Sequence, residues 1–535
     1  MPAAAPAIWW IKLDFRLHDN PALTAALAAH ERVVPVFAFE PRVLRAAETS
    51  GFHVAAWCEA LVDLRTRLRK TGGDVLVVEG DAPEVLAKAC ELTGARHVYS
   101  HEEIGTELTF ARDREVGAWA EASGVAWHEH MQTGVFRGGI DRDRRHRAWK
   151  KFMDAGPLPT PPAEDLARVG VPEVLRELEL QGPLTPERFG HPLTEAQWAQ
   201  RQPVSETAAG DTLRSFLYER GACYSFGISS PNLAFACGSR LSVHFAWGTT
   251  TGRAAYHALE QRRAELKDGT SDEAKQWRRS LTAFRSRLHW RDHFTQRLEA
   301  EPSSEFVPIN RAYEALPTPG DVHFDDWLHG RTGWPMVDAC MRCAATTGFL
   351  NFRMRAMVTS VAVHTLRIDW RRLVHPVARL WADYAPGIHV SQTQMQAGVV
   401  GINQLRGYSP DKQLLDHDAE ATFVKTWIPE LRDATPAEIK RHTGGDFVAG
   451  YRPPLIDRIE SFKAFKADYY GIKRLPETKA LAEEVYARHG SRRSPASRTW
   501  RSNVPKGARG ANKKAGAKDK SGKAAATPQG ALFGG

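Results

Sequence analysis

The chain has 535 residues, 42% of them hydrophobic, and a formal net charge of +9. This length and apolar content allow a large buried core and two or more domains. No apolar run approaches the roughly 20 residues that cross a bilayer, and Lys12, Asp14 and Arg16 interrupt the apolar start, which argues against a secretory signal. The six cysteines are sparse for this length, so we expect a protein of the reducing cytoplasm.

The first 130 or so residues alternate β-like runs with segments of helical pattern. The β-like runs are 8–13, 33–39, 75–79, 97–100 and 125–130. This alternation predicts an α/β domain over residues 1–132, with an open, parallel, Rossmann-like sheet. The dinucleotide fingerprint Gly-x-Gly-x-x-Gly does not follow the first run, so the usual phosphate-binding turn is not predicted there.

Three further segments follow. Residues 133–205 are predicted to connect two domains, and their proline-rich stretch 157–162 is typical of an extended crossing. From 206 to 475 the apolar spacing predicts an all-α domain. Residues 490–535 hold eleven Lys or Arg and one acid, whereas the rest of the chain holds 61 basic and 62 acidic residues. Their Gly, Ala, Ser and Lys content predicts a disordered basic tail.

Two predicted helices in residues 330–370 carry polar side chains among apolar ones. The second, from about Phe352 to Ile368, includes Arg353 and Arg355. A charge on a mostly apolar helix must be paired or must face a ligand, because an unpaired buried charge is costly. The pattern therefore indicates a binding site, with two core helices as the alternative. Cys340-x-x-Cys343 has no second matching pair, so we expect it to pack in the core and predict no metal site.

A segment rich in small residues, Gly238-Ser239-Arg240-Leu241-Ser242, follows Tyr224 in the helical domain. Small residues let a ligand approach the backbone, and Ser hydroxyls with helix N-terminal amides suit a pyrophosphate. Helix capping is the alternative explanation for these serines.

The ordered motifs resemble those of the photolyase/cryptochrome family. Residues 13–23, Leu-Asp-Phe-Arg-Leu-His-Asp-Asn-Pro-Ala-Leu, are similar to its opening signature, and the order Gly-x-Thr-Gly-x-Pro-x-Val-Asp-Ala-x-Met-Arg, then Arg-x-Arg, within 330–370 is similar to its flavin-binding helices. The resemblance implies an antenna-type α/β domain, an all-α domain that binds FAD, and a second, antenna chromophore of unspecified identity. Asp19 and Asn20 have an alternative explanation as caps of the helix that Pro21 starts.

The resemblance also implies which positions bind the flavin. They are Tyr224, Gly238, Ser239, Arg240, Leu241, Ser242, Trp290, Arg355, Asp383, Ala385 and His389. Arg355 and Asp383 match an ion pair that fixes the flavin ring and stabilises negative charge near its N1 atom. Gly238 replaces a usual Thr, Ala385 replaces a second Asp, and His389 falls at or near an Asn beside N5. We expect His389 to titrate near neutrality and to make flavin redox behaviour depend on pH between about 5 and 8.

The positions implied for lesion binding and electron transfer depart further from the family. The lesion contacts are Arg287, Trp290, Asn351 and Phe352, with Arg287 in place of a Glu and Phe352 in place of an Asn. Of the family's three electron-transferring tryptophans only Trp370 is matched, because Thr393 stands at the first position. We expect Trp370, His389 and Trp290 to be catalytic, with Trp381 or Trp334 completing the electron route.

Two functions compete. The leading interpretation is a light-driven DNA repair enzyme in which an electron passes from photoexcited reduced FAD to a flipped-out pyrimidine dimer, with a cyclobutane dimer favoured over a (6-4) product. The alternative is a cryptochrome-like blue-light photoreceptor with weak or no repair, since His389 and the incomplete tryptophan chain favour signalling. A nucleotide-binding protein without photochemistry is a third class, which the ordered motifs oppose.

The basic tail predicts phosphate binding without sequence preference. It ends in Gln529-Gly530-Ala531-Leu532-Phe533, which resembles the Gln-x-x-Leu-Phe peptide by which bacterial DNA-repair proteins dock on the sliding clamp. The expected partners are therefore DNA containing pyrimidine dimers and, through Gln529, Leu532 and Phe533, a sliding clamp. We expect the protein itself to be a monomer.

Overall fold

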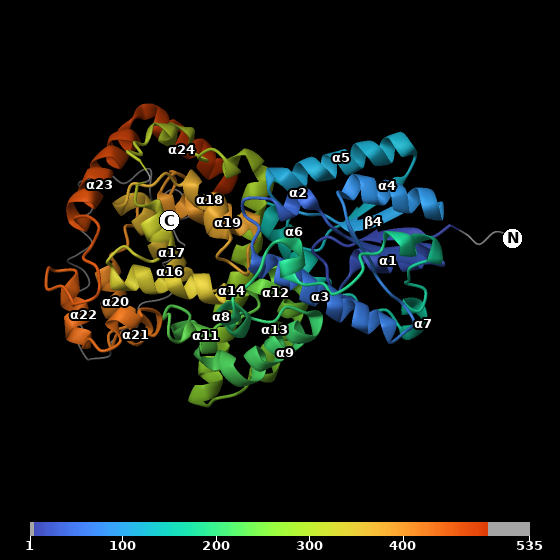
Figure 1. Cartoon of the computed structure of the whole chain (residues 1–535), viewed down its shortest axis with the longest axis horizontal. Coiled ribbons are helices and arrows are strands. Elements are labelled where there is room, and N and C mark those ends of the chain that lie inside the picture. The colour runs from blue at the N-terminus through green and yellow to red at the C-terminus, as the bar shows by residue number, and fades with distance from the viewer. Residues whose placement is uncertain (1–4, 321, 491–535) are drawn as a thin grey trace.

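A five-stranded parallel sheet organises the N-terminal domain, which is coloured blue to cyan in Figure 1. The computed structural model describes residues 5–320 and 322–490. The strands are β1 Ala7–Trp10, β2 Val33–Phe39, β3 Leu76–Glu79, β4 His97–His101 and β5 Ala126–His130. They lie in the order β3-β2-β1-β4-β5, and every neighbouring pair is parallel. The predicted α/β fold is confirmed, and each strand overlaps one predicted β-like run.

Helices cover both faces of this sheet, and its strands β1 and β2 are buried on both sides. The helices are α1 Pro21–Ala29, α2 Pro41–Leu44, α3 Gly51–Arg69, α4 Ala82–Thr93 and α5 Glu107–Ser123. In β1, Ile8 and Trp10 join one buried layer, while Trp9 packs into the other. Successive side chains point to opposite faces of a strand, so a continuous apolar strand must be covered twice.

The connector combines short helices with extended chain. It contains α6 Arg145–Asp154, α7 Ala163–Leu166, η1 Glu173–Leu178, η2 Pro186–Phe189 and α8 Glu195–Gln200. Residues 157–162 form neither helix nor strand, which fits the extended crossing expected there. Val169 pairs with Val33 at the start of β2, so the connector is also anchored on the sheet.

The remaining described elements are helical, as predicted for the second domain. They are α9 Glu206–Ser215, η3 Phe216–Arg220, η4 Gly221–Cys223, α10 Tyr224–Gly227, α11 Ala234–Cys237, α12 Ser242–Ala246, α13 Gly252–Glu265, α14 Asp272–Ala300, η5 Pro302–Glu305, η6 Arg311–Ala315, α15 Phe324–Leu328, α16 Pro335–Thr347, α17 Phe352–Ser360, η7 Val361–Thr365, α18 Arg371–Ala378, α19 Pro386–Ala397, α20 Pro410–His417, α21 Thr422–Trp427, η8 Pro429–Leu431, α22 Pro436–His442, α23 Arg458–Arg474 and α24 Pro476–His489. The helices continue past residue 475 to His489.

Among the described residues, no helix combines the length and the apolar character that a membrane crossing requires. The predicted basic tail, apart from Gly490, lies outside the described residues.

The two helices predicted in residues 330–370 are α16 and α17, and η7 continues the second. Asp338 is a buried polar residue of α16, and burial raises its pKa. Its carboxylate accepts hydrogen bonds from the amides of Thr332, at 2.8 Å, and Gly333, at 3.0 Å, and from the Tyr451 hydroxyl at 2.5 Å. This polar residue therefore has a structural task, since it ties the start of α16 to the segment before α23.

The opening motif, residues 13–23, also has structural tasks. Asn20 caps α1, because its side-chain oxygen accepts a hydrogen bond from the Leu23 amide at 2.9 Å, as the capping interpretation predicted. The neighbouring Asp19 binds the helical domain instead.

Asp19 lies in a buried polar cluster that joins the two domains. Its φ of +52° is left-handed, and its side chain is buried. The carboxylate forms an ion pair with Arg253 and accepts hydrogen bonds from the Thr251 hydroxyl at 2.5 Å and the Leu158 amide at 3.0 Å. Burial would raise the pKa of Asp19, but Arg253, Thr251 and the Leu158 amide lower it overall.

We predict that Asp19→Asn destabilises the protein by about 3 kcal/mol, because Arg253 is left buried without a counter-ion while Asn still tolerates the left-handed backbone. Folding lowers the pKa of Asp19, so its stabilisation is fully present above the ordinary value of 3.8, begins to fall below that value and is lost as the pH falls through the lower pKa of the folded state. Urea unfolding followed by circular dichroism at pH 7 and pH 3.5 measures both effects.

The matched control is Asp272→Asn, which removes an exposed carboxylate paired with Lys275 and should change stability little. Equal unfolding midpoints for Asp19→Asn and the parent at pH 7 would contradict the role given to Asp19.

Candidate functional site

A cavity of about 340 Å³ lies in the helical domain, lined by α14, α17, α18, α19 and residues 224–246. Its lining is mostly apolar with few polar groups, as is usual for cofactor sites. The charged residues on its wall are Arg240, Arg287, Arg291, Arg355 and Asp383. Four guanidinium groups thus face one carboxylate, so the cavity suits an anionic ligand. Nowhere in the described ranges do three His, Cys, Asp or Glu side chains group as a metal site requires.

One face of α14 forms a wall of this cavity. Phe284, Arg287, Leu288, Arg291 and Phe294 recur at helical spacing and all line it. Trp290 also lines it and stacks on Phe294 with ring centres 5.6 Å apart. The resemblance pointed to Arg287 and Trp290, whereas Phe284 and Phe294 were missed. The i, i+3 and i, i+4 neighbours of Arg287 would have indicated that face.

The small-residue segment contributes four of its five residues to the wall, and three of them, Ser239, Arg240 and Ser242, bring polar side chains. Gly238 also lines the cavity, and a Cβ atom there would lie 2.4 Å from the Ala234 carbonyl oxygen. The Thr usual in the family would therefore not fit this backbone. Leu241 is fully buried in a neighbouring apolar cluster and is not part of the wall.

Arg240 carries an unsatisfied donor inside the site. Its φ is +59°, and its guanidinium lies 3.7 Å from the centre of the Phe349 ring. Burial lowers its pKa to about 10, which still leaves it charged at neutral pH, and its Nη1 atom is buried without a hydrogen-bond partner. An anionic ligand in the cavity would satisfy this atom.

Arg355 and Asp383 form an ion pair on the same wall, with Nη2 2.8 Å from Oδ1. Arg355 also donates from Nε to the Leu350 carbonyl at 2.7 Å. Burial would raise the pKa of Asp383, but Arg355 and a hydrogen bond from Ser242 lower it overall, so the carboxylate is charged at neutral pH. The pair is fixed in place and presents both charges to one ligand.

The four predicted lesion contacts, Arg287, Trp290, Asn351 and Phe352, line this cavity together. The Arg287 guanidinium lies 4.6 Å from the centre of the Phe352 ring and also hydrogen-bonds with the buried Tyr224 hydroxyl. Asn351 donates to the Ile228 carbonyl at 3.0 Å, while its buried Oδ1 has no partner. A buried acceptor without a donor is rare in folded proteins, and a ligand or an ordered water is the usual source of the missing hydrogen bond.

His389 lines the cavity one helical turn after Ala385, but it does not titrate as expected. Its Nε2 lies 2.7 Å from the Val374 carbonyl oxygen, so this nitrogen carries the proton and donates it. Burial lowers the pKa of His389 to about 4. The ring is therefore neutral between pH 5 and 8, and the expectation of titration near neutrality is wrong. Burial of this kind is a property of the folded chain that the local sequence does not reveal.

The tryptophans separate into two groups. Trp381 lines the cavity and lies 4.3 Å from the Arg355 guanidinium, whereas Trp370 and Trp334 are buried away from it. Trp370 is nevertheless close, because its carbonyl accepts a hydrogen bond from the amide of Leu373, which does line the cavity. Thr393 is on the wall and brings no ring.

A second cavity, of about 180 Å³, lies where strands β1, β2 and β4 end. The strand order reverses between β1 and β4, and ligands of such sheets bind at that point. The α/β domain contributes Trp10, Glu40 and Arg112 to the wall of this cavity. The residues that line both cavities are Phe245, Ala246, Arg291, Tyr384 and Ala385. A single layer of side chains therefore separates the two sites.

Two family models match the chain. Residues 7–152 match the model described as DNA photolyase, and residues 284–470 match the FAD binding domain of DNA photolyase. The deoxyribodipyrimidine photo-lyase of a Synechococcus species is 28% identical over 494 residues, which cover 88% of this chain and 97% of the relative. The cryptochrome DASH of Natronomonas pharaonis is also 28% identical, over 487 residues that cover 84% and 98%.

Solved structures show the same fold. A bacterial class III photolyase from Agrobacterium tumefaciens superposes with a TM-score of 0.74 at 23% identity, covering 89% of this chain and 99% of the other. An archaeal photolyase from Sulfolobus tokodaii with two FAD molecules gives a TM-score of 0.70 at 24% identity, covering 87% and 100%. The chain belongs to the photolyase/cryptochrome family, as a distant member with an α/β domain and a helical FAD-binding domain.

Proposed function

We propose that the protein binds FAD in the larger cavity and repairs a pyrimidine dimer in DNA when illuminated, with a cyclobutane dimer as the favoured lesion. One observation supports this most directly: the Arg355–Asp383 pair, the polar residues Ser239, Arg240 and Ser242, and the side chains at the lesion positions all line one cavity. A cofactor and a flipped-out base would then meet in a single site.

The chain's own residues fit FAD. Ser239, Arg240 and Ser242 would hold its phosphates, and the unsatisfied Nη1 of Arg240 would gain an acceptor. Arg355 and Asp383 would orient the ring system, and the apolar wall would exclude water. When bound, FAD supplies the light absorption and the electron.

The lesion side of the cavity combines rings with a positive charge. Trp290 and Phe352 would contact the faces of the dimer, since bases stack on aromatic rings. Arg287, held over the Phe352 ring, would reach a phosphate or a base carbonyl. A dimer is easier to extrude than a paired base, which favours selection of damaged sites.

A blue-light photoreceptor is the second candidate. Thr393 replaces a ring at the first position of the electron-transfer chain, and relatives named cryptochrome DASH match as well as those named photo-lyase. Both proposals require FAD, and they differ in whether DNA is repaired.

A repair assay decides between them. We expect blue light to convert a cyclobutane dimer in an oligonucleotide to two pyrimidines when the FAD in the protein is reduced, and the dark control to leave it intact. The same assay with a (6-4) product tests the other lesion. Lack of light-dependent repair of either lesion, by a protein that holds FAD, would favour the photoreceptor.

We predict that Asp383→Ala raises the dissociation constant for FAD about tenfold or more, because Arg355 then faces the cavity without its counter-ion. Equilibrium dialysis in the dark measures the constant. The matched control is Asp369→Ala, which breaks a half-exposed ion pair with Arg371 outside the cavity. FAD affinity equal to that of the parent in Asp383→Ala would overturn the assignment of this wall.

We predict that Trp381→Phe and Trp370→Phe each slow light-driven flavin reduction about tenfold, equivalent to about 1.4 kcal/mol of activation free energy. Trp381 lines the cavity and Trp370 lies one helical turn behind Leu373. Trp334→Phe is the matched control. Trp334 was the alternative expected from the sequence, but it is equally buried, does not line the cavity, and its hydrogen-bond partners Thr332, Val337 and Asp338 do not line it either. Absorbance changes under steady blue light measure the rate, and an unchanged rate in both variants would exclude this route.

We also propose that the smaller cavity holds the antenna chromophore, because the wall it shares with the larger cavity would keep the two ligands close. The basic tail would add affinity for DNA of any sequence, and Gln529, Leu532 and Phe533 would bind a sliding clamp. These three residues lie outside the described residues.

A further inference from the structure

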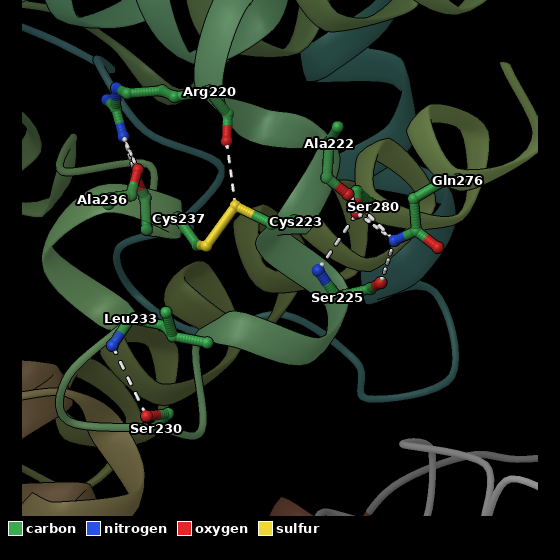
Figure 2. Close-up of a disulfide and its surroundings, with 11 residues drawn as sticks. Arg220, Ala222, Cys223, Ser225, Ser230, Leu233, Ala236, Cys237, Gln276 and Ser280 are labelled. Carbon is green, nitrogen blue, oxygen red and sulfur yellow. Dashed lines mark hydrogen bonds between the residues drawn. A yellow bond between two sulfur atoms is a disulfide. The ribbon is translucent and has the colours of Figure 1, made fainter. Parts of the chain in front are cut away.

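A disulfide joins two short segments of the FAD-cavity wall, as Figure 2 shows. It links Cys223 and Cys237, which are 14 positions apart with their Cα atoms 5.3 Å from each other. The residue after each cysteine, Tyr224 and Gly238, lines the cavity. The small number of cysteines did not predict this bond. It fixes the distance between two parts of the chain that both line the cavity proposed for FAD.

One side of the disulfide is held firmly on α14. Ser280 donates to the Ala222 carbonyl at 2.6 Å and accepts from the Ser225 amide at 3.1 Å. Gln276 donates to the same carbonyl at 2.9 Å and to the Ser225 hydroxyl at 3.0 Å (Figure 2). Cys223 lies between these two anchored residues, so its backbone keeps its place whether or not the disulfide is present.

The other side depends more on the disulfide. Cys237 ends α11, a four-residue helix that is too short to be stable by itself. A Cβ atom on Gly227 would lie 2.5 Å from the Cys237 sulfur, so that sulfur packs directly on the backbone of α10. The other ties of this segment to the rest of the domain come from two long side chains. The Arg220 guanidinium donates to the Ala236 carbonyl at 3.3 Å, to the Ser239 carbonyl at 2.7 Å and also to the Gly238 carbonyl, and Gln202 donates to the Arg240 carbonyl at 2.8 Å.

The two cysteine residues differ in exposure. Cys223 is half-buried, whereas Cys237 is only 4% exposed. The four free cysteines of the chain are buried, and burial raises the pKa of Cys58 and Cys343 to about 12. Their thiols are therefore poor nucleophiles, and a thiol in solution meets the Cys223 sulfur first.

We propose that Cys223 and Cys237 form a redox-modification site at which a dithiol reductant controls how tightly the protein holds FAD. A thiolate of the reductant attacks the Cys223 sulfur, the bond to Cys237 breaks, and Cys237 leaves as a thiolate that takes up a proton. The Arg220 guanidinium binds the carbonyls of Ala236 and Gly238, the residues on either side of Cys237, and a cation near a cysteine favours its thiolate form. The second thiol of the reductant then displaces Cys223, so two electrons and two protons pass from the dithiol to the protein.

Reduction has unequal consequences for the two sides. The Cys223 sulfur lies 3.3 Å from the Arg220 carbonyl oxygen, so the new thiol has an acceptor in place. Cys237 loses its tether, and the segment that continues into Ser239 and Arg240 becomes more mobile. FAD must then order this segment as it binds, which lowers its affinity. The proposal rests on FAD binding in this cavity, as proposed above.

The test measures FAD affinity in both redox states of the full chain, in the dark. Alkylation and mass spectrometry first establish whether residues 223 and 237 are linked. We expect treatment with dithiothreitol to raise the FAD dissociation constant about tenfold, as for loss of one ordered contact, and reoxidation to restore it. The double variant Cys223→Ser/Cys237→Ser should match the reduced parent and ignore the reductant, while Cys90→Ser, a matched control in the α/β domain, should behave as the parent does.

Two results would overturn this redox proposal but not the proposed function. They are free thiols at both positions after mild oxidation, and the same FAD dissociation constant in both redox states. The parent arm needs no substitution, so misfolding of the double variant would not affect this decision. A parent that binds no FAD in either state would instead overturn the proposed function, and this proposal with it.

Discussion

The cost of placing arginine side chains in an apolar cavity governs the arrangement around it. A guanidinium stays charged at neutral pH, so each one needs an acceptor, a carboxylate, an aromatic face or an anionic ligand. Arg355 has Asp383 and the Trp381 ring, Arg287 has the Phe352 ring and Tyr224, and Arg240 has the Phe349 ring but keeps one unsatisfied nitrogen. The helices that supply these partners must stay in register for the charges to be tolerated. A dinucleotide with two phosphates is the kind of ligand that such a balance lacks.

One of these arginines lies in the wall between the two cavities. Arg291 is on the wall of both, and its own counter-ion is Asp292, which accepts from Trp149 and the Gly134 amide of the connector. The larger site is therefore linked by hydrogen bonds to the segment that joins the domains. Asp19 and Arg253 hold the interface at another point. Any change in how the domains meet would alter the layer between the two cavities.

Much of the fold was predictable because it follows from short-range patterns. Buried β-like runs such as 33–39 and helical spacing such as that of α16 depend on neighbours in the sequence, and Asn20 before Pro21 is a local capping signal. Site positions came from the resemblance and not from the spacing. The resemblance did not give the protonation state of His389, because its neutral state depends on burial by other elements of the fold. The Cys223–Cys237 bond depends on a reversal of the chain between α10 and α11. The turn-type residues Ser230, Pro231 and Asn232 lie there, but a local turn signal does not indicate which cysteines the turn brings together.

The two replacements at the predicted lesion positions, Arg287 and Phe352, are physically compatible with each other. A Glu and an Asn at positions 287 and 352 would offer hydrogen bonds, whereas Arg287 and Phe352 contact each other through a cation and a ring. That contact holds the guanidinium beside the cavity, and it exchanges a negative charge for a positive one next to a ligand that carries phosphates. A dimer held there would be recognised by ring contact and charge more than by the pattern of its hydrogen-bond donors. The Trp290–Phe294 stack supplies a second aromatic face on α14, so under the proposed function this wall would offer rings to a base where the usual polar contacts are replaced.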